Sequence, residues 1–248
     1  MARWGRAAAR ATVAAMRPRL EIAAAQPACA QDVSANALEH ARAIRAAGAR
    51  LVVFPELSLT GYELDAEAVS AHDEALLPLV EACEETGTVA LVGAPVDGGG
   101  GRLHIGMLRV GAAGVDVVYR KSYIGGAERT RFTPGDGPVA LEVDGWRVGV
   151  GICKDTGVER HVEEIAALDV DVYAAGLVHR PDELAVQEER AVRIARSCGA
   201  YVAFASFAGA AGGRYDRTAG RSSIWAPDGT PLARAGPQPG GIARASLA

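Results

Sequence analysis

The sequence of 248 residues lacks the features that mark several common protein classes. Its four cysteines contain no C-x-x-C pair, so neither a zinc ribbon nor a redox motif is indicated. Its five histidines show no H-E-x-x-H spacing, and we expect no metal and no cofactor. No apolar run reaches the ~18 residues of a membrane span, and a net charge of -4 gives no basic footprint. We therefore expect neither a membrane nor a nucleic acid as partner.

Length and composition favour a single α/β domain over residues 18–248. Residues 1–17 are rich in Arg and Ala and lack the long apolar core of a secretory signal. They are expected to be a tail. Three interpretations are open: a translation start assigned too far upstream, a natural disordered extension, or a targeting segment. Without a secretory signal, a reducing cytoplasm is the expected location, and the cysteines need not pair.

The first half of the chain alternates strand and helix patterns. Apolar runs predict buried strands at 20–26, 51–54 and 88–96. Helical spacing predicts a helix over 34–49, capped by Ser34 and ended by Gly48, and a second helix over 66–87 that Pro78 breaks or kinks. This alternation favours an α/β sandwich.

The second half is more antiparallel in its first part. Strands at 139–143 and 146–152 flank an Asp144-Gly145 turn that is typical of a hairpin, and the glycine-rich stretch 97–101 is interpreted as another hairpin loop. Helices are then predicted over 158–170 and 181–199, with a strand between them.

Three chemically capable residues stand where predicted strands end, which is where ligands collect in open α/β sheets. Glu56 follows LVVFP, Lys121 follows VDVVYR and Cys153 follows WRVGVGI. A thiol reacts as thiolate, so Cys153 needs a base or a nearby cation, and Glu56 and Lys121 offer one of each. Taken singly, each residue also has an ordinary structural interpretation, as a buried thiol or a solvated strand end.

The three residues lie in segments that resemble the nitrilase superfamily, also called carbon-nitrogen hydrolases. FPELSLTGY at 54–62 resembles its F-P-E-x-x-x-T-G-Y block, YRKSYIGGAERTRFTPG at 119–135 its lysine block, and GVGICKDTGVER at 149–160 its nucleophile block. The order Glu, Lys, Cys is also the order of the family. Weaker similarity extends from about Leu20 to the C-terminus.

The resemblance implies a four-layer α-β-β-α sandwich, usually a homodimer, and a hydrolase of small amides or N-carbamoyl compounds that acts on non-peptide C–N bonds. By this analogy Cys153 attacks the substrate carbon, Glu56 transfers protons, and Lys121 holds the oxyanion with the backbone N–H of Lys154. A thioester forms and water releases the acid. An amide leaving group must be protonated to depart, and a fixed cation stabilises the developing charge.

The same comparison adds further candidate site residues. Glu128 matches a second glutamate that orients the lysine or the substrate, with pairing to a neighbouring arginine as the alternative. Asp155 is interpreted as a structural partner of the nucleophile turn. Tyr62 is either a pocket wall or core, and His179 is either a pocket residue or a satisfied histidine.

Lys154 departs from the family pattern, in which an aromatic residue commonly follows the cysteine. A free Lys154 ammonium would favour an acidic substrate, whereas pairing with Asp155 or Glu159 would make it structural.

Other functions are weighed against this one. A true nitrilase usually carries Trp-Glu where Lys154-Asp155 stands here. A cysteine-histidine hydrolase would use His161 or His179 as base. A non-catalytic binding domain could use the same pocket. A dinucleotide-binding turn is excluded, because Gly149-x-Gly151 is not followed by x-x-Gly.

Overall fold

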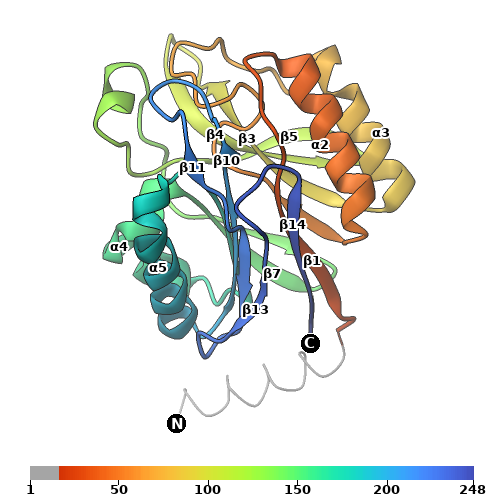
Figure 1. Ribbon diagram of the computed structural model, residues 1–248, viewed down its shortest axis with the longest axis vertical. Coiled ribbons are helices and arrows are strands. Elements are labelled where there is room, and N and C mark those ends of the chain that lie inside the picture. Colours follow the sequence, from red (N-terminus) through yellow and green to blue (C-terminus); the bar gives the residue numbers. More distant parts are fainter. Residues whose placement is uncertain (1–16) are drawn as a thin grey trace.

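A computed structural model describes residues 17–248, which fold into four layers. Two six-stranded sheets lie face to face in the middle, and a pair of helices covers the outer face of each (Figure 1). The predicted α-β-β-α sandwich is confirmed.

The first sheet contains three parallel strands extended on both sides by antiparallel neighbours. Its order is β14 (Gly241–Leu247), β1 (Leu20–Gln26), β2 (Leu51–Val53), β3 (Val89–Asp97), β4 (Leu103–Gly111) and β5 (Gly114–Arg120). The helices that cover it are α2 (Val33–Ala47) and α3 (Leu77–Thr86), with the 3-10 turn η1 (Glu74–Leu76) ahead of α3.

The second sheet repeats this plan, with β7, β8 and β9 parallel and antiparallel strands outside them. Its order is β13 (Pro231–Arg234), β12 (Ser223–Trp225), β9 (Tyr201–Ser206), β8 (Val172–Leu177), β7 (Trp146–Ile152) and β6 (Ala140–Val143). The helices that cover it are α4 (Glu159–Ala167) and α5 (Leu184–Cys198). Shorter elements are η2 (Ala127–Thr130), η3 (Cys153–Gly157), η4 (Pro181–Glu183) and the ribbon of β10 (Ala208–Gly209) and β11 (Thr218–Ala219).

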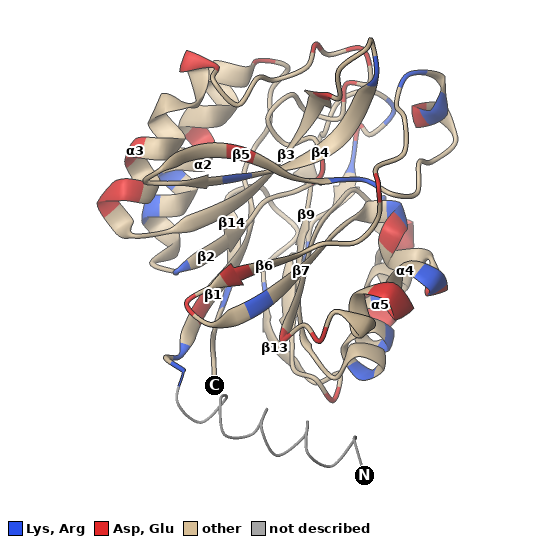
Figure 2. Ribbon diagram, turned by 180° about the vertical axis from the view of Figure 1, so that it is seen from behind, with Lys and Arg blue, Asp and Glu red and all other residues tan. Residues whose placement is uncertain are grey.

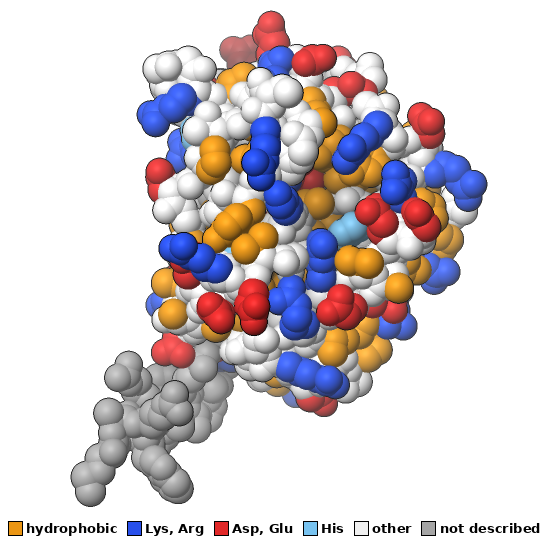
Figure 3. Space-filling model, turned by 90° about the vertical axis from the view of Figure 1, so that its left-hand side faces the viewer, with side chains coloured by type: hydrophobic (Ala, Val, Ile, Leu, Met, Phe, Trp, Pro, Cys, Tyr) orange, Lys and Arg blue, Asp and Glu red, His pale blue; other side chains and the backbone are white. Residues whose placement is uncertain are grey.

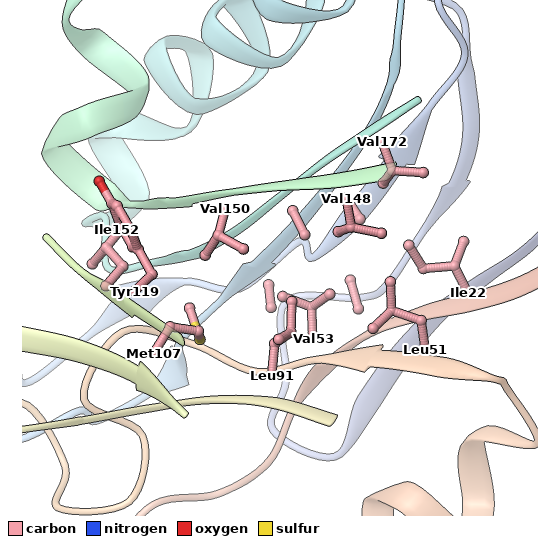
Figure 4. Close-up of a cluster of buried hydrophobic side chains, with 14 of the residues drawn as sticks. Ile22, Leu51, Val53, Leu91, Met107, Tyr119, Val148, Val150, Ile152 and Val172 are labelled. Atoms are coloured by element: carbon pink, nitrogen blue, oxygen red, sulfur yellow. The ribbon is translucent and has the colours of Figure 1, made fainter. Parts of the chain in front are cut away.

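The central core lies between the two sheets. Figure 4 shows Leu51, Val53, Leu91 and Met107 of the first sheet facing Val148, Val150, Ile152 and Val172 of the second. Strand residues alternate between faces, so β7 places Val148, Val150 and Ile152 in this core. Charged side chains lie mainly on the helices, loops and outer strands (Figure 2). Apolar burial on both faces of the sheets therefore fixes the ends of β2 and β7 with respect to each other.

Two local predictions for helices are corrected by the structure. The N-cap of α2 is Asp32 rather than Ser34, because the Asp32 carboxylate accepts the N–H of Ala35 at 2.7 Å. The helix predicted over 66–87 begins only at Leu77. Pro78 lies in its first turn, where a missing N–H leaves no hydrogen bond unmade.

The predicted tail lies outside the described residues except for Arg17. Its guanidinium stacks 3.5 Å from the Trp146 ring centroid and pairs with Asp171 at 2.7 Å. Arg17 is therefore packed onto the domain.

Candidate active site

Glu56 lies in a turn that follows β2 between the two sheets. The side chain is fully buried, and Leu57 next to it has a left-handed backbone with φ of 54°. Gly93 of β3 and Gly176 of β8 press on this turn from opposite sheets. A Cβ on Gly93 would lie 2.4 Å from the Pro55 carbonyl oxygen, and one on Gly176 would lie 2.6 Å from the Glu56 nitrogen. Only glycine fits at these close approaches.

Lys121 directly follows β5, and its side chain is 1% exposed. Backbone hydrogen bonds hold the residue on both sides, from its N–H to Ile105 and from the Gly135 N–H to its carbonyl, each 2.8 Å long. The ammonium donates to Glu56 Oε1 at 2.6 Å and to both carboxylate oxygens of Glu128 at 2.8 Å. The cation is therefore fixed between two carboxylates.

Glu128 lies on η2, and three groups besides burial define its position. It contacts the Lys121 ammonium, the Gly125 N–H at 2.6 Å and the Tyr62 hydroxyl. Burial alone would raise the pKa of Glu128, but Lys121 and these hydrogen bonds hold it below its usual value. Glu128 is thus an ionised partner of Lys121 and does not pair with Arg129 or Arg131, the alternative weighed from the sequence.

Cys153 begins η3 directly after β7, in a sharp turn. Its φ is 42°, a strained conformation for a residue with a side chain. The carboxylate of Asp155 accepts the Ile152 N–H at 3.0 Å, and the Thr156 hydroxyl donates to the Cys153 carbonyl at 2.6 Å. The residue as a whole is partly exposed, and its thiol contacts the Val178 carbonyl, with sulfur and oxygen 3.6 Å apart. The turn presents the thiol at the end of the sheet.

Glu56, Lys121 and Cys153 shift one another's pKa values. Burial raises the pKa of Glu56 to about 7, although the Lys121 charge acts in the other direction. Burial and the Glu56 charge raise the pKa of Cys153 above its usual range, outweighing Lys121. Burial opposes the charge on Lys121, but Glu56 and the other nearby anions keep its pKa high. The resting site therefore holds a thiol, a cation and a carboxyl that titrates near neutrality.

One oxygen of Glu56 is available to receive a proton. Oε1 accepts from Lys121, whereas Oε2 is buried and accepts no hydrogen bond from residues 17–248. A carboxyl with this pKa and a free oxygen is suited to general acid–base chemistry at neutral pH.

Asp155 anchors the turn from behind, as the sequence suggested. Its carboxylate also accepts the Tyr119 hydroxyl at 2.8 Å and the Tyr123 N–H at 2.9 Å. His161 belongs to the same buried network, with Nε2 3.0 Å from the Tyr119 oxygen. Tyr119 and Tyr123 precede and follow Lys121 closely, so the network ties the lysine segment to the nucleophile turn.

Neither histidine considered as a base bonds to the thiol within the described part of the chain. His161 bonds to Tyr119, and His179 bonds through Nδ1 to Gln187 Oε1 at 3.1 Å. Burial lowers the pKa of both rings. His179 is a buried histidine directly after Val178, and a substrate contact stays a prediction.

Within the range that the structure describes, Lys154 is not paired with either of the two carboxylates considered for it, and its effect on substrate charge stays a prediction. Its ammonium donates to the Ile124 carbonyl at 3.0 Å, and over residues 17–248 it forms no ion pair with Asp155 or Glu159. This contact fastens the nucleophile turn to the segment that follows Lys121.

A pocket of about 270 Å³ opens beside the cluster, lined by Tyr62, Glu128, the 125–127 loop and Arg214. Tyr62 lines this pocket and also belongs to the buried core, where its ring packs edge-on against Tyr215, and a substrate contact stays a prediction. Sequence reasoning missed Arg214 and Tyr215, whose only local signal is a glycine-rich loop before them. In the described residues, no group of three His, Cys, Asp or Glu side chains could hold a metal ion.

Known proteins resemble this chain over most of its length. The family model described as carbon-nitrogen hydrolase matches residues 21–248. A Pseudomonas protegens protein named "Hydrolase in pqqF 5'region" is 31% identical over 83% of this chain and 74% of its own length. The glutamine-dependent NAD(+) synthetase of Mycobacterium tuberculosis is 30% identical over 85% of this chain, which spans 35% of that protein.

Solved structures of similar fold belong to the same family. An amidase of the nitrilase superfamily from Nesterenkonia sp. AN1 superposes with a TM-score of 0.82 at 26% identity, covering 94% of this chain and 93% of that one.

Among the helices of residues 17–248, none has the length and apolar character of a membrane span. The matched family model and the fold together establish that this chain is an enzyme of the carbon-nitrogen hydrolase family, the nitrilase superfamily.

Proposed function

We propose that the protein hydrolyses a small amide or an N-carbamoyl compound through a thioester on Cys153, and that ammonia or an amine leaves. The observation that carries the proposal is the buried Lys121 ammonium, held between Glu56 and Glu128 beside the Cys153 turn. These groups supply a nucleophile, a base and a fixed cation, which are the parts that acyl transfer from an amide requires.

The first half-reaction begins with proton transfer from the Cys153 thiol to Glu56. The sulfur attacks the carbonyl carbon, and the Lys121 ammonium and the Lys154 backbone N–H stabilise the oxyanion. Glu56 then gives its proton to the nitrogen as the C–N bond breaks. A Glu56 pKa of about 7 suits both directions of this transfer at neutral pH.

The second half-reaction releases the acid. Glu56 takes a proton from water, the water oxygen attacks the thioester carbon, and the proton returns to the sulfur as the C–S bond breaks. Glu128 holds Lys121 in both half-reactions through contacts with both of its carboxylate oxygens.

Two relatives support an amide as substrate. The Nesterenkonia amidase is described with the acetamide moiety of fluoroacetamide covalently added at its active-site cysteine. A Pseudomonas (R)-stereoselective amidase is 30% identical over 56% of this chain and 55% of its own length.

The test is ammonia release from a panel of amides, N-carbamoyl compounds and nitriles, with intact-mass detection of the acyl-enzyme. Cys153→Ala is expected to lower kcat/KM by about 1000-fold or more and to abolish the adduct. Cys198 is a partly buried thiol bonded to the Val162 carbonyl, so Cys198→Ala is the matched control and should keep both the activity and the acyl adduct. Full activity of Cys153→Ala would refute the mechanism. Activity in Glu56→Gln together with loss in a His161 or His179 variant would favour a cysteine-histidine hydrolase.

A further inference from the structure

His161 of α4 is a buried histidine close behind the nucleophile turn. Figure 3 shows the face formed by α4, α5 and the segment between β5 and β6, with charged side chains on its surface. His161 lies beneath this surface with an exposed fraction of 0%, and the other buried residues of α4 are Val162 and Ile165. Burying an imidazole costs free energy unless its nitrogens are hydrogen-bonded. The partners of the two ring nitrogens therefore decide what this side chain does.

The Asp155 carboxylate joins the two catalytic segments by three hydrogen bonds. It accepts the Ile152 N–H, at the start of the nucleophile turn, at 3.0 Å. It accepts the Tyr123 N–H, in the segment that follows Lys121, at 2.9 Å. The third donor is the Tyr119 hydroxyl at 2.8 Å. The relative placement of the two segments thus depends on how Asp155 is oriented.

His161 determines the direction in which the Tyr119 hydroxyl donates. Its Nε2 lies 3.0 Å from the Tyr119 oxygen. A phenol has one hydroxyl hydrogen, and an ionised carboxylate only accepts, so this hydrogen lies toward Asp155. The Tyr119 oxygen must then accept from His161, and Nε2 carries the ring proton. The Ser122 hydroxyl, 3.0 Å away, is a further donor to the same oxygen.

The second ring nitrogen of His161 faces Tyr173 of β8. Its Nδ1 lies 3.5 Å from the Tyr173 oxygen. With the proton on Nε2, Nδ1 is an acceptor and the Tyr173 hydroxyl is the donor. A Cβ on Gly151 of β7 would lie 1.9 Å from that hydroxyl oxygen, so the glycine leaves the space that Tyr173 fills. Both nitrogens have a partner, and burial lowers the pKa of the ring, which keeps it neutral.

Three tyrosine rings hold the imidazole in its orientation. The Tyr119, Tyr123 and Tyr173 rings pack against it edge-on, with centroids 6.2, 6.2 and 6.1 Å away. Edge-on contact is a preferred arrangement of ring pairs. A flip of the ring would exchange its nitrogens and break both hydrogen bonds. The packing therefore supports one tautomer in one orientation.

We infer that His161 is a positioning residue of the active site, which as the neutral Nε2–H tautomer directs the Tyr119 hydroxyl onto Asp155. Asp155 in turn keeps the Cys153 turn and the Lys121 segment in register. If the proton were on Nδ1, Nε2 would compete with the carboxylate for the hydroxyl hydrogen. The inference rests on the proposed function, because register matters for the reaction at Cys153, and it gives His161 no proton transfer in that reaction.

The test uses two substitutions that differ in reach. The side-chain nitrogen of a glutamine falls near the Nε2 position of a histidine, and that of an asparagine near Nδ1. His161→Gln is expected to keep kcat within about fivefold of wild type, whereas His161→Asn should lower it by about 10- to 100-fold, as expected for a slightly misplaced catalytic group. KM should change by less than about threefold in both, since the buried ring lies away from the substrate. A glutamine is no general base, so its activity also separates positioning from a base role.

Two controls separate positioning from loss of fold. The rates are referred to the fraction of protein whose Cys153 forms the acyl adduct, so that unfolded molecules do not contribute. Tyr119→Phe removes the hydroxyl that His161 directs, and should lower kcat about as much as His161→Asn. The double variant should lose no more than the larger single loss, because the two residues act through one chain of hydrogen bonds.

Nuclear magnetic resonance of protein with 15N-labelled histidine shows the tautomer without any substrate. His161 should carry a hydrogen-bonded proton on Nε2 and none on Nδ1 at neutral pH. In Tyr119→Phe the signal of this proton should move upfield, because its acceptor is gone.

The outcomes distinguish the two proposals. A proton on Nδ1, a kcat of His161→Asn within twofold of wild type, equal losses in the Gln and Asn variants, or additive losses in the double variant would each overturn the positioning role and leave the hydrolase mechanism standing. Failure to release ammonia from any amide refutes the proposed function, and the Nε2 proton signal with its response to Tyr119→Phe then decides the hydrogen-bond chain independently.

Discussion

Replacing Glu128 with glutamine removes one of the two negative charges that flank Lys121, while the side chain keeps its size. Both carboxylates contact the same ammonium nitrogen, Glu56 at 2.6 Å and Glu128 at 2.8 Å. The Glu128 charge is one of the causes that raise the pKa of Glu56 to about 7, after burial. Its removal favours ionised Glu56 and therefore lowers that pKa.

The size of the change follows from the spacing of the charges. Two unit charges about 5 Å apart interact by ~3 kcal/mol at an effective dielectric constant of about 20, which corresponds to ~2 in pKa. We therefore expect the pKa of Glu56 to fall by about 1 to 2.

The assay is the pH dependence of kcat/KM, whose acid limb reports ionisation of the free enzyme. Protonated Glu56 cannot accept the Cys153 proton, so wild-type activity should decline as pH falls through about 7. The limb of Glu128→Gln should lie about 1 to 2 pH units lower, whatever its maximum rate. Tyr62→Phe removes a hydrogen bond to Glu128 without changing charge, and should move the limb much less.

An acid limb of Glu128→Gln at the wild-type position, or at higher pH, would refute the electrostatic reasoning. An equal displacement in Tyr62→Phe would assign the effect to hydrogen bonding instead of charge.

Two further predictions concern the supports of the site. Gly176→Ala places a Cβ 2.6 Å from the Glu56 nitrogen. It should lower the free energy of unfolding, measured by urea titration, by about 1–3 kcal/mol, and kcat/KM in the amide assay by about 100-fold. In the control Gly111→Ala the added Cβ meets no atom within 4 Å, so both quantities should stay close to wild type. His40 is fully buried and burial lowers its pKa to about 4, so between pH 6.5 and 4 the unfolded state binds more protons and stability falls. Acidification from pH 7 to 4.5 should lower the free energy of unfolding by about 2–3 kcal/mol more in wild type than in His40→Gln. The control His72→Gln, at an exposed histidine, should lose as much stability as wild type. Equal losses of stability in all three proteins would contradict this account.

The fold was largely predictable because its strands are short apolar runs bounded by clear turns. The Asp144-Gly145 turn forms a hairpin, as predicted, with φ of 50° and 81°. The start of α3 was not predictable, because residues 66–73 have enough alanine for helical spacing while the turn before Leu77 is set by tertiary contacts such as the Val69 N–H to Pro95 carbonyl bond.

By itself the sequence indicated an α/β fold and placed Glu56, Lys121 and Cys153 at strand ends, because local blocks of residues encode strand ends and turns. The resemblance of those blocks to the carbon-nitrogen hydrolases implied the four-layer sandwich. Only the tertiary structure decided which charged side chains form ion pairs and hydrogen bonds with each other. It set Lys121 between Glu56 and Glu128 and bonded Lys154 to a backbone carbonyl. It also brought Arg214 to the pocket. These relations join segments far apart along the chain, and charge and burial act through space, so no local pattern records them.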